Sequence, residues 1–208
     1  MENAYAPYRA ALFQTNSKAQ AESVQAIATA QRMWQDIRST LLNAPPMPYQ
    51  QDNGLAATAE RIGKVYEKAA LEAGAGKLPE AHETLEEARD LMADIRQRNG
   101  VVVFSDHMNA YHAKMEHVLI DGPKWLVDSN GLFELTTRMG VLHYLAQRLD
   151  SQAPTSLRGN AEFKQLWQAV QKSVDGLRTA LASGDKAAVQ NAIAALKSPY
   201  SKLFKQFG

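Results

Sequence analysis

The sequence contains no cysteine among its 208 residues. This absence excludes disulfides, thiolate metal sites, iron–sulfur ligation and covalent haem attachment. Runs of β-branched residues are scarce, while Ala, Gln, Leu, Lys and Glu are abundant, so the composition favours helices. Hydrophobic residues make up 45% and charged residues 22%, which is ordinary for a globular protein with a buried core.

The chain also lacks an excess of charge of either sign. Its 23 basic and 22 acidic residues give a net charge of +1 and are scattered along the sequence. Nucleic-acid binding needs a basic footprint, and an anionic membrane surface attracts polybasic clusters. No apolar segment approaches the ~20 residues of a membrane span. We therefore expect neither a nucleic-acid partner nor membrane insertion.

Familiar catalytic motifs are missing as well. No Glu is followed by His three residues later, so the paired Glu-x-x-His motifs of carboxylate-bridged di-iron bundles are absent. The sequence also contains no HExxH, no glycine-rich nucleotide-binding motif and no GxSxG. These absences predict a protein that is not an enzyme.

The amino-terminal segment carries no secretion signal. It begins Met1-Glu2-Asn3, with neither a basic region nor an apolar stretch after it. The chain is therefore cytoplasmic, or it is exported to the periplasm and has lost its signal peptide. We favour export, because the Met/His metal chemistry described below suits that compartment.

Hydrophobic residues recur at the i, i+3, i+4 spacing of buried helix faces. This periodicity predicts helices over 4–14, 18–43, 54–73, 79–98, 106–120, 131–150, 159–182 and 185–206. Proline and glycine place a loop at 44–53 and a helix stop at 121–123. Apolar residues 101–104 favour an extended connection. The sequence predicts an all-α, antiparallel up-down bundle of seven to eight helices. It forms one domain over 1–208, or alternatively two halves, 1–100 and 101–208.

A weak internal repeat supports two related helical hairpins. Residues 76–88 (GKLPEAHETLEEA) align without gaps with residues 184–196 (GDKAAVQNAIAAL). In this alignment Leu85 corresponds to Ile193, and Ile95 to Leu203. Chance resemblance between alanine-rich amphipathic helices is the alternative explanation.

The helix predicted over 106–120 carries three of the five histidines. A helix advances about 100° per residue, so His107, His112 and His117 point to different sides and cannot bind one ion together. Met108 and Met115 lie on the inward stripe, and His112 lies at its edge. Glu116 follows His112 by one turn, so the compatible ligand set is Met108, His112, Met115 and Glu116.

The helix over 131–150 repeats the Met-x-x-x-His pattern with Met139 and His143. If the two helices pair antiparallel, Met108 faces His143 and His112 faces Met139. Imidazole and thioether ligands together suit copper, and recruitment of Glu116 shifts the preference towards iron or Cu(II). The pattern predicts a soluble metal-binding protein for copper or iron binding, storage or transfer. Non-covalent haem held by Met and His is an alternative.

A simpler hypothesis assigns these methionines and histidines structural roles and no metal binding. Methionines on an apolar stripe are usually core filler, and edge histidines are usually structural. The chain would then be a helical interaction or scaffold protein that binds another protein, provided that Tyr111, Trp125 or Phe133 is exposed. Three further residues are assigned structural roles: Trp34 and Trp167 as core anchors, and His82 as a surface partner of Glu86.

Overall fold

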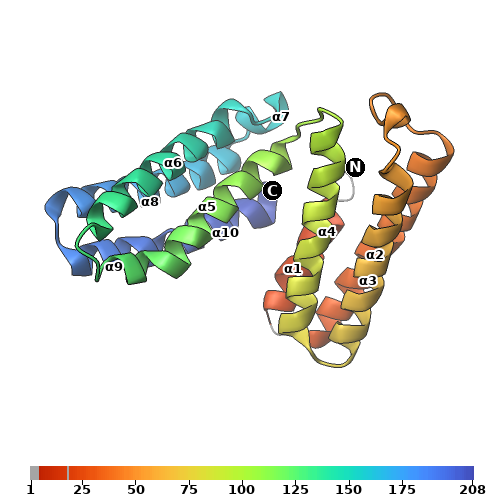
Figure 1. The fold of residues 1–208 in the computed structure, drawn as a ribbon, viewed down its shortest axis with the longest axis horizontal. Helices are drawn as coiled ribbons and strands as arrows, with labels where there is room; N and C mark the ends of the chain where they lie inside the picture. The colour runs from red at the N-terminus through yellow and green to blue at the C-terminus, as the bar shows by residue number, and fades with distance from the viewer. Residues whose placement is uncertain (1–4, 18) are drawn as a thin grey trace. The chain divides into compact units, whose positions relative to one another are not determined.

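A computed structural model describes residues 5–17 and 19–208, and every regular element in that part of the chain is helical (Figure 1). The predicted all-α architecture of antiparallel neighbours is therefore confirmed. No helix within the described ranges is long and apolar enough to cross a membrane. The elements are α1 (Tyr5–Asn16), α2 (Gln20–Asn43), the 3-10 helix η2 (Tyr49–Gln51), α3 (Leu55–Gly74), α4 (Leu78–Arg98), α5 (Phe104–Trp125), α6 (Gly131–Ser151), α7 (Thr155–Arg158), α8 (Ala161–Ser183), α9 (Lys186–Ala195) and α10 (Lys197–Phe207).

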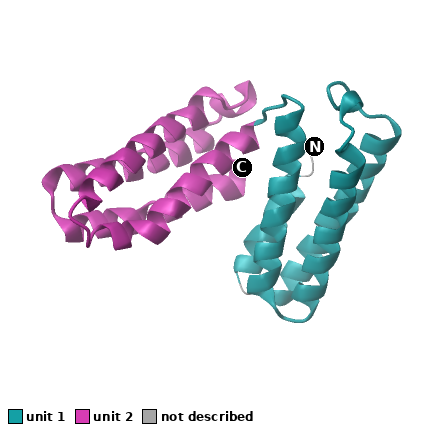
Figure 2. Cartoon of the chain, in the orientation of Figure 1, with its two compact units in different colours: residues 1–103 teal, residues 104–208 magenta. Residues whose placement is uncertain are grey.

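The chain divides into two compact units, residues 1–103 and 104–208, which Figure 2 colours separately. In the first unit, α1 packs against α2, α2 against α3, α3 against α4, and α4 back against α1. In the second, α5, α6 and α8 follow the same order, and α9 with α10 supplies the fourth side. Each unit is thus a four-sided bundle that encloses its own apolar stripes.

Polar groups connect neighbouring helices inside the first unit. Trp34 is fully buried, and its indole N–H donates to the Ala59 carbonyl at 3.1 Å, which joins α2 to α3. His82 Nδ1 lies 3.1 Å from both the Leu12 carbonyl and the Thr15 hydroxyl. Because a carbonyl can only accept, Nδ1 carries the proton and joins α4 to α1. His82 therefore bonds α1 rather than Glu86, whose carboxylate pairs with Arg89.

The second unit departs from the predicted helix ends in two places. The helix predicted over 185–206 is divided at Leu196 into α9 and α10, and Pro199 stands in the first turn of α10, where proline is tolerated. The predicted stop at 121–123 is wrong, because α5 runs through Pro123 to Trp125. A Cβ on Gly122 would lie 2.9 Å from Ile193 Cδ1, so this glycine lets α9 pack closely on the end of α5.

The two segments of the internal repeat occupy equivalent places. Residues 76–88 open α4 and residues 184–196 cover α9, and each stretch begins the fourth side of its unit. Leu85, Ile95, Ile193 and Leu203 are all buried. The alignment therefore matches core positions to core positions in two bundles of the same order.

Asp52 fastens the proline-rich connection to the end of α4. Its side chain is only 6% exposed and accepts from Arg98 Nε at 2.8 Å, from Asn99 Nδ2 at 2.7 Å and from the Gly54 N–H at 2.9 Å. Burial alone would raise the pKa of this carboxyl, but the hydrogen bonds to its charged form outweigh burial and lower the pKa.

Replacing Asp52 should remove a pH-dependent part of the stability. A lowered folded-state pKa stabilises the unit above the unfolded-state pKa of about 3.9, and this contribution is lost as the pH falls through the folded-state pKa. We expect Asp52→Asn to lower the free energy of unfolding by about 1.5–3 kcal/mol near pH 7 and to differ little from wild type below both pKa values. Urea unfolding across pH measures this. Asp90→Asn, at an exposed ion pair, is the control and should change little; a constant difference at all pH values would contradict the account.

Candidate functional site

The His112 side chain lies in an aromatic stack between α5 and α10. Its ring is parallel to the Tyr200 ring, with centroids 5.4 Å apart, and also stacks with Phe204 at 6.5 Å. Tyr111 stacks on Tyr200 at 5.2 Å, and burial raises the pKa of the Tyr111 phenol. These contacts fix the orientation of the imidazole, so His112 is held by packing against α10.

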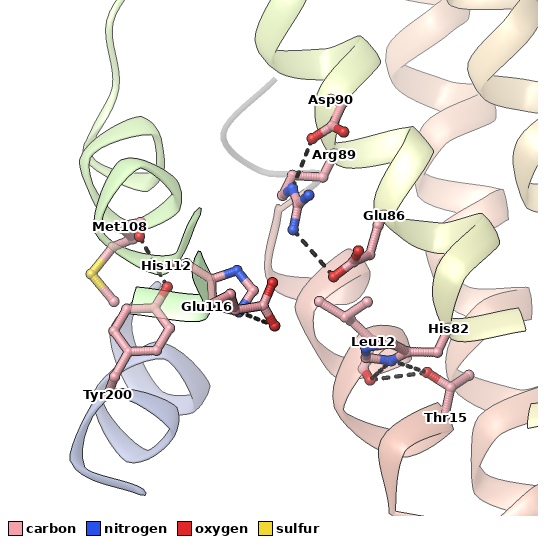
Figure 3. A network of polar contacts seen from close by, with 10 residues as sticks. All are labelled: Leu12, Thr15, His82, Glu86, Arg89, Asp90, Met108, His112, Glu116 and Tyr200. Atoms are coloured by element: carbon pink, nitrogen blue, oxygen red, sulfur yellow. Dashed lines mark hydrogen bonds and ion pairs between the residues drawn. The ribbon is translucent and has the colours of Figure 1, made fainter. Parts of the chain in front are cut away.

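Two polar contacts complete this cluster. His112 Nε2 lies 3.3 Å from Glu116 Oε1, one turn along α5. The Tyr200 hydroxyl donates to the Met108 carbonyl at 3.0 Å. Figure 3 shows the Met108 thioether and the His112 imidazole pointing away from each other. The backbone of Met108 therefore takes part in the cluster, while its sulfur does not.

The methionines of the predicted metal site belong to the hydrophobic core. Met108 and Met115 on α5 and Met139 on α6 are all buried in the core of the second unit. The other members of this core are aliphatic and aromatic residues, an environment that methionine commonly occupies. For Met108 and Met115, this placement confirms the inward stripe predicted from the sequence.

His143 engages a different neighbour from His112. α5 and α6 pack together as predicted, but His143 Nε2 lies 3.0 Å from Gln147 Nε2, and Nδ1 lies 3.9 Å from Asp175 on α8. His112 thus faces α10 and His143 faces α8. Throughout the part of the chain that the structure describes, no three His, Asp or Glu side chains form a group suited to a metal ion.

The remaining histidines of α5 have separate surroundings. His117 Nε2 pairs with Asp121 at 3.1 Å, and its ring meets the edge of Trp125 at 5.3 Å. The pKa of His107 is lowered, first by burial and then by the nearby Arg148 charge. The three histidines therefore do not converge, as helical geometry predicted.

The outer face of α6 carries large apolar side chains that the core does not use. Phe133 is 75% exposed, Tyr144 56% and Val141 39%. Helical geometry places them, with four small or polar exposed residues, within an arc of about 140°. Glu134, Arg138 and His143 fall outside this arc, whereas the partly buried Arg148 falls within it. Seven exposed residues of this arc are uncharged, and we call them the α6 outer face: Phe133, Thr136, Thr137, Gly140, Val141, Tyr144 and Gln147.

This surface differs from an ordinary solvated helix face. The exposed positions of α8, for comparison, include Glu162, Lys164, Lys172 and Arg178. The sequence indicated Phe133 as a candidate binding aromatic but did not connect it with Val141 and Tyr144 on the same side of the helix. The available signal was the placement of Phe133 and Tyr144 opposite the inward stripe, since an apolar residue there gains nothing from the core.

Comparisons with known proteins find no matching family model, no matching curated protein and no matching solved structure. The function of this chain must therefore be inferred from the geometry of its own residues. Three features bear on it: the His112 cluster, the separate His143 contacts and the α6 outer face.

The His112 cluster should act as a structural clamp between α5 and α10. We expect Tyr200→Phe to lower the free energy of unfolding by about 1 kcal/mol, because the hydrogen bond to the Met108 carbonyl is lost while the ring stacking is kept. Tyr200→Ala also removes the stacking and should cost about 3–5 kcal/mol. Denaturant unfolding followed by tryptophan fluorescence measures both changes. Tyr144→Phe, at an exposed phenol, is the control and should have little effect. Equal losses for Tyr200→Phe and Tyr200→Ala would refute the clamp.

Proposed function

We propose that the protein is a helical interaction module that binds another polypeptide through the α6 outer face. The observation that carries this proposal is the exposure of Phe133 and Tyr144 on a helix side whose exposed residues are uncharged, with the partly buried Arg148 guanidinium against the Tyr144 ring. Contiguous exposed apolar surface on a folded protein is characteristic of an interaction site.

The core of the second unit is complete without these residues. The inward side of α6 supplies Leu135, Met139, Leu142, Ala146 and Leu149, all buried. Phe133 and Tyr144 lie on the opposite side and contribute little to this packing. Their exposure costs solvation free energy, which a binding partner would recover by covering them.

The side chains of this face suit a protein partner. Aromatic residues dominate binding energies at interfaces, because they bury a large area at small conformational cost. Tyr144 is further positioned by Arg148, whose guanidinium lies 5.9 Å from the centre of the ring. Threonine and glycine between the two aromatic side chains leave space for the side chains of a partner.

Copper or iron binding by Met and His is the competing proposal, with haem as its variant. It stays a prediction, and a shared site would require His112 to leave the Tyr200 stack and His143 to turn away from α8. The three methionines would also have to leave the core. The cost of these rearrangements makes the interaction module the better-supported function.

Calorimetric titration with Cu(I), Cu(II) and Fe(II) separates these two proposals. Because the histidines have different partners, we expect wild type and the His112→Ala/His143→Ala variant to bind each ion with equal affinity. His117→Ala, at a more exposed histidine, is the matched control. A loss of affinity in the double variant alone would instead support the Met/His site.

Site-specific photo-crosslinking tests the interaction module. We expect a photo-reactive side chain at Thr137 to give discrete protein adducts in the cells that produce this protein, because this position lies within the α6 outer face. Thr179 on α8 is a matched control position: it is also exposed, and both hydroxyls donate to the carbonyl four residues earlier. The adducts should disappear when Phe133→Ser and Tyr144→Ser are added.

Two outcomes would refute the interaction module. One is the absence of adducts at Thr137. The other is the same set of adducts at Thr137 and Thr179, because contact through α6 cannot produce it. Circular dichroism on each variant establishes that the helices are intact. The mass of the adduct also reports whether the partner is this chain or another protein.

A further inference from the structure

We infer that the α6 outer face binds a second copy of this chain, with the two α6 helices antiparallel and crossing at Gly140. This inference rests on the proposed function, since it names the partner of the same surface. Three properties of the face support it: the spacing of its residues, the distribution of their sizes and the charges along its flank.

The first property is a regular seam along α6. Phe133, Thr137, Gly140, Tyr144 and Gln147 follow one another at alternating intervals of four and three residues. This is the spacing with which one helix packs along another over several turns. A second helix could therefore follow the seam over its whole length.

The second property is the distribution of residue sizes about Gly140. Each aromatic residue has a smaller or more flexible residue at the same distance from Gly140 on the other side. A Cβ at Gly140 would meet no side chain and no other described element within 4 Å, so the helix surface has an open notch at this residue. In an antiparallel pair centred on this residue, a side chain that precedes Gly140 in one copy meets the side chain that follows Gly140 by the same number of residues in the other copy. Tyr144 then covers the partner's Thr136, and Phe133 covers the partner's Gln147. Each aromatic ring thus meets a smaller or more adaptable side chain, and the contact repeats itself under a two-fold axis.

The third property is the charge on one flank of the seam. Glu134 and Arg148 lie on the same side of α6, within about 40° of each other around the helix. In an antiparallel pair, the two-fold axis places this side of both helices on the same side of the seam. Glu134 of each copy therefore approaches Arg148 of the other copy. A parallel pair would instead place Glu134 and the partner's Arg148 on opposite sides of the seam, so this attraction would be lost. The charges therefore favour the antiparallel arrangement.

The expected complex is weak. The surface area that a single pair of helices buries is at or below the lower limit for specific interfaces, which bury roughly 1,200–2,000 Å² in total. The dimer should therefore exchange with monomer and depend on protein concentration.

Sedimentation equilibrium of the full chain, from micromolar to millimolar concentrations, tests the inference. We expect a monomer–dimer equilibrium whose dissociation constant rises at least roughly tenfold in Gly140→Glu. This substitution fills the notch, puts like charges together at the two-fold axis and replaces glycine with a better helix former. The control is Gly176→Glu on α8, where a Cβ also meets nothing within 4 Å, and it should leave the equilibrium unchanged.

A mixing experiment identifies the partner as a second copy. Arg148→Glu and Glu134→Arg each create two like-charge pairs along the flank of the homodimer, so each variant alone should dimerise more weakly. An equal mixture restores both opposite-charge pairs and should recover dimer formation. Monomer at all concentrations, or dimers insensitive to Gly140→Glu, would overturn the inference. Adducts between Thr137 and a different protein would do so too, while still supporting the interaction module.

Discussion

Burial of one apolar stripe per helix is the constraint on which the structure depends. A helix with a single apolar side cannot stand alone in water, so each stripe must face others across a common interior. Two bundles, residues 1–103 and residues 104–208, meet this requirement. In each bundle, helices that follow one another in the sequence form four sides around a shared apolar interior. Hydrogen bonds such as those of Trp34 and His82 then fix which helices are neighbours, because a buried polar group must find its partner.

The α6 helix buries an apolar stripe on one side and also carries apolar side chains on the other side, facing water. Its inward residues complete the core, and its outward residues Phe133 and Tyr144 remain in water. Burial within the unit cannot explain an apolar side chain on the solvent side. The same hydrophobic effect that assembles each bundle therefore accounts for the proposed contact between copies, at a much smaller area. Gly140 and the threonines beside it determine how closely a second helix can approach.

The sequence predicted the helices because their periodicity is local information. It placed most ends within a few residues and correctly assigned Met108 and Met115 to the inward stripe. It failed at Pro123, because the stop signal there is overridden by packing of Ile193 and Leu135 around Gly122. The partners of His112 and His143 also escaped prediction. They lie on α10 and α8, and contacts between distant segments are not encoded in the spacing along one helix.

The arrangement of two α6 helices can be measured directly by electron spin resonance distances. The chain contains no cysteine, so Gln147→Cys and Ser151→Cys each provide one unique spin-label site. In an antiparallel pair centred on Gly140, the distance between labels grows by about 3 Å for each residue away from the centre. The account predicts that the Ser151→Cys pair is about 12 Å farther apart than the Gln147→Cys pair. Equal distances at the two sites, or no dipolar coupling at either, would contradict it.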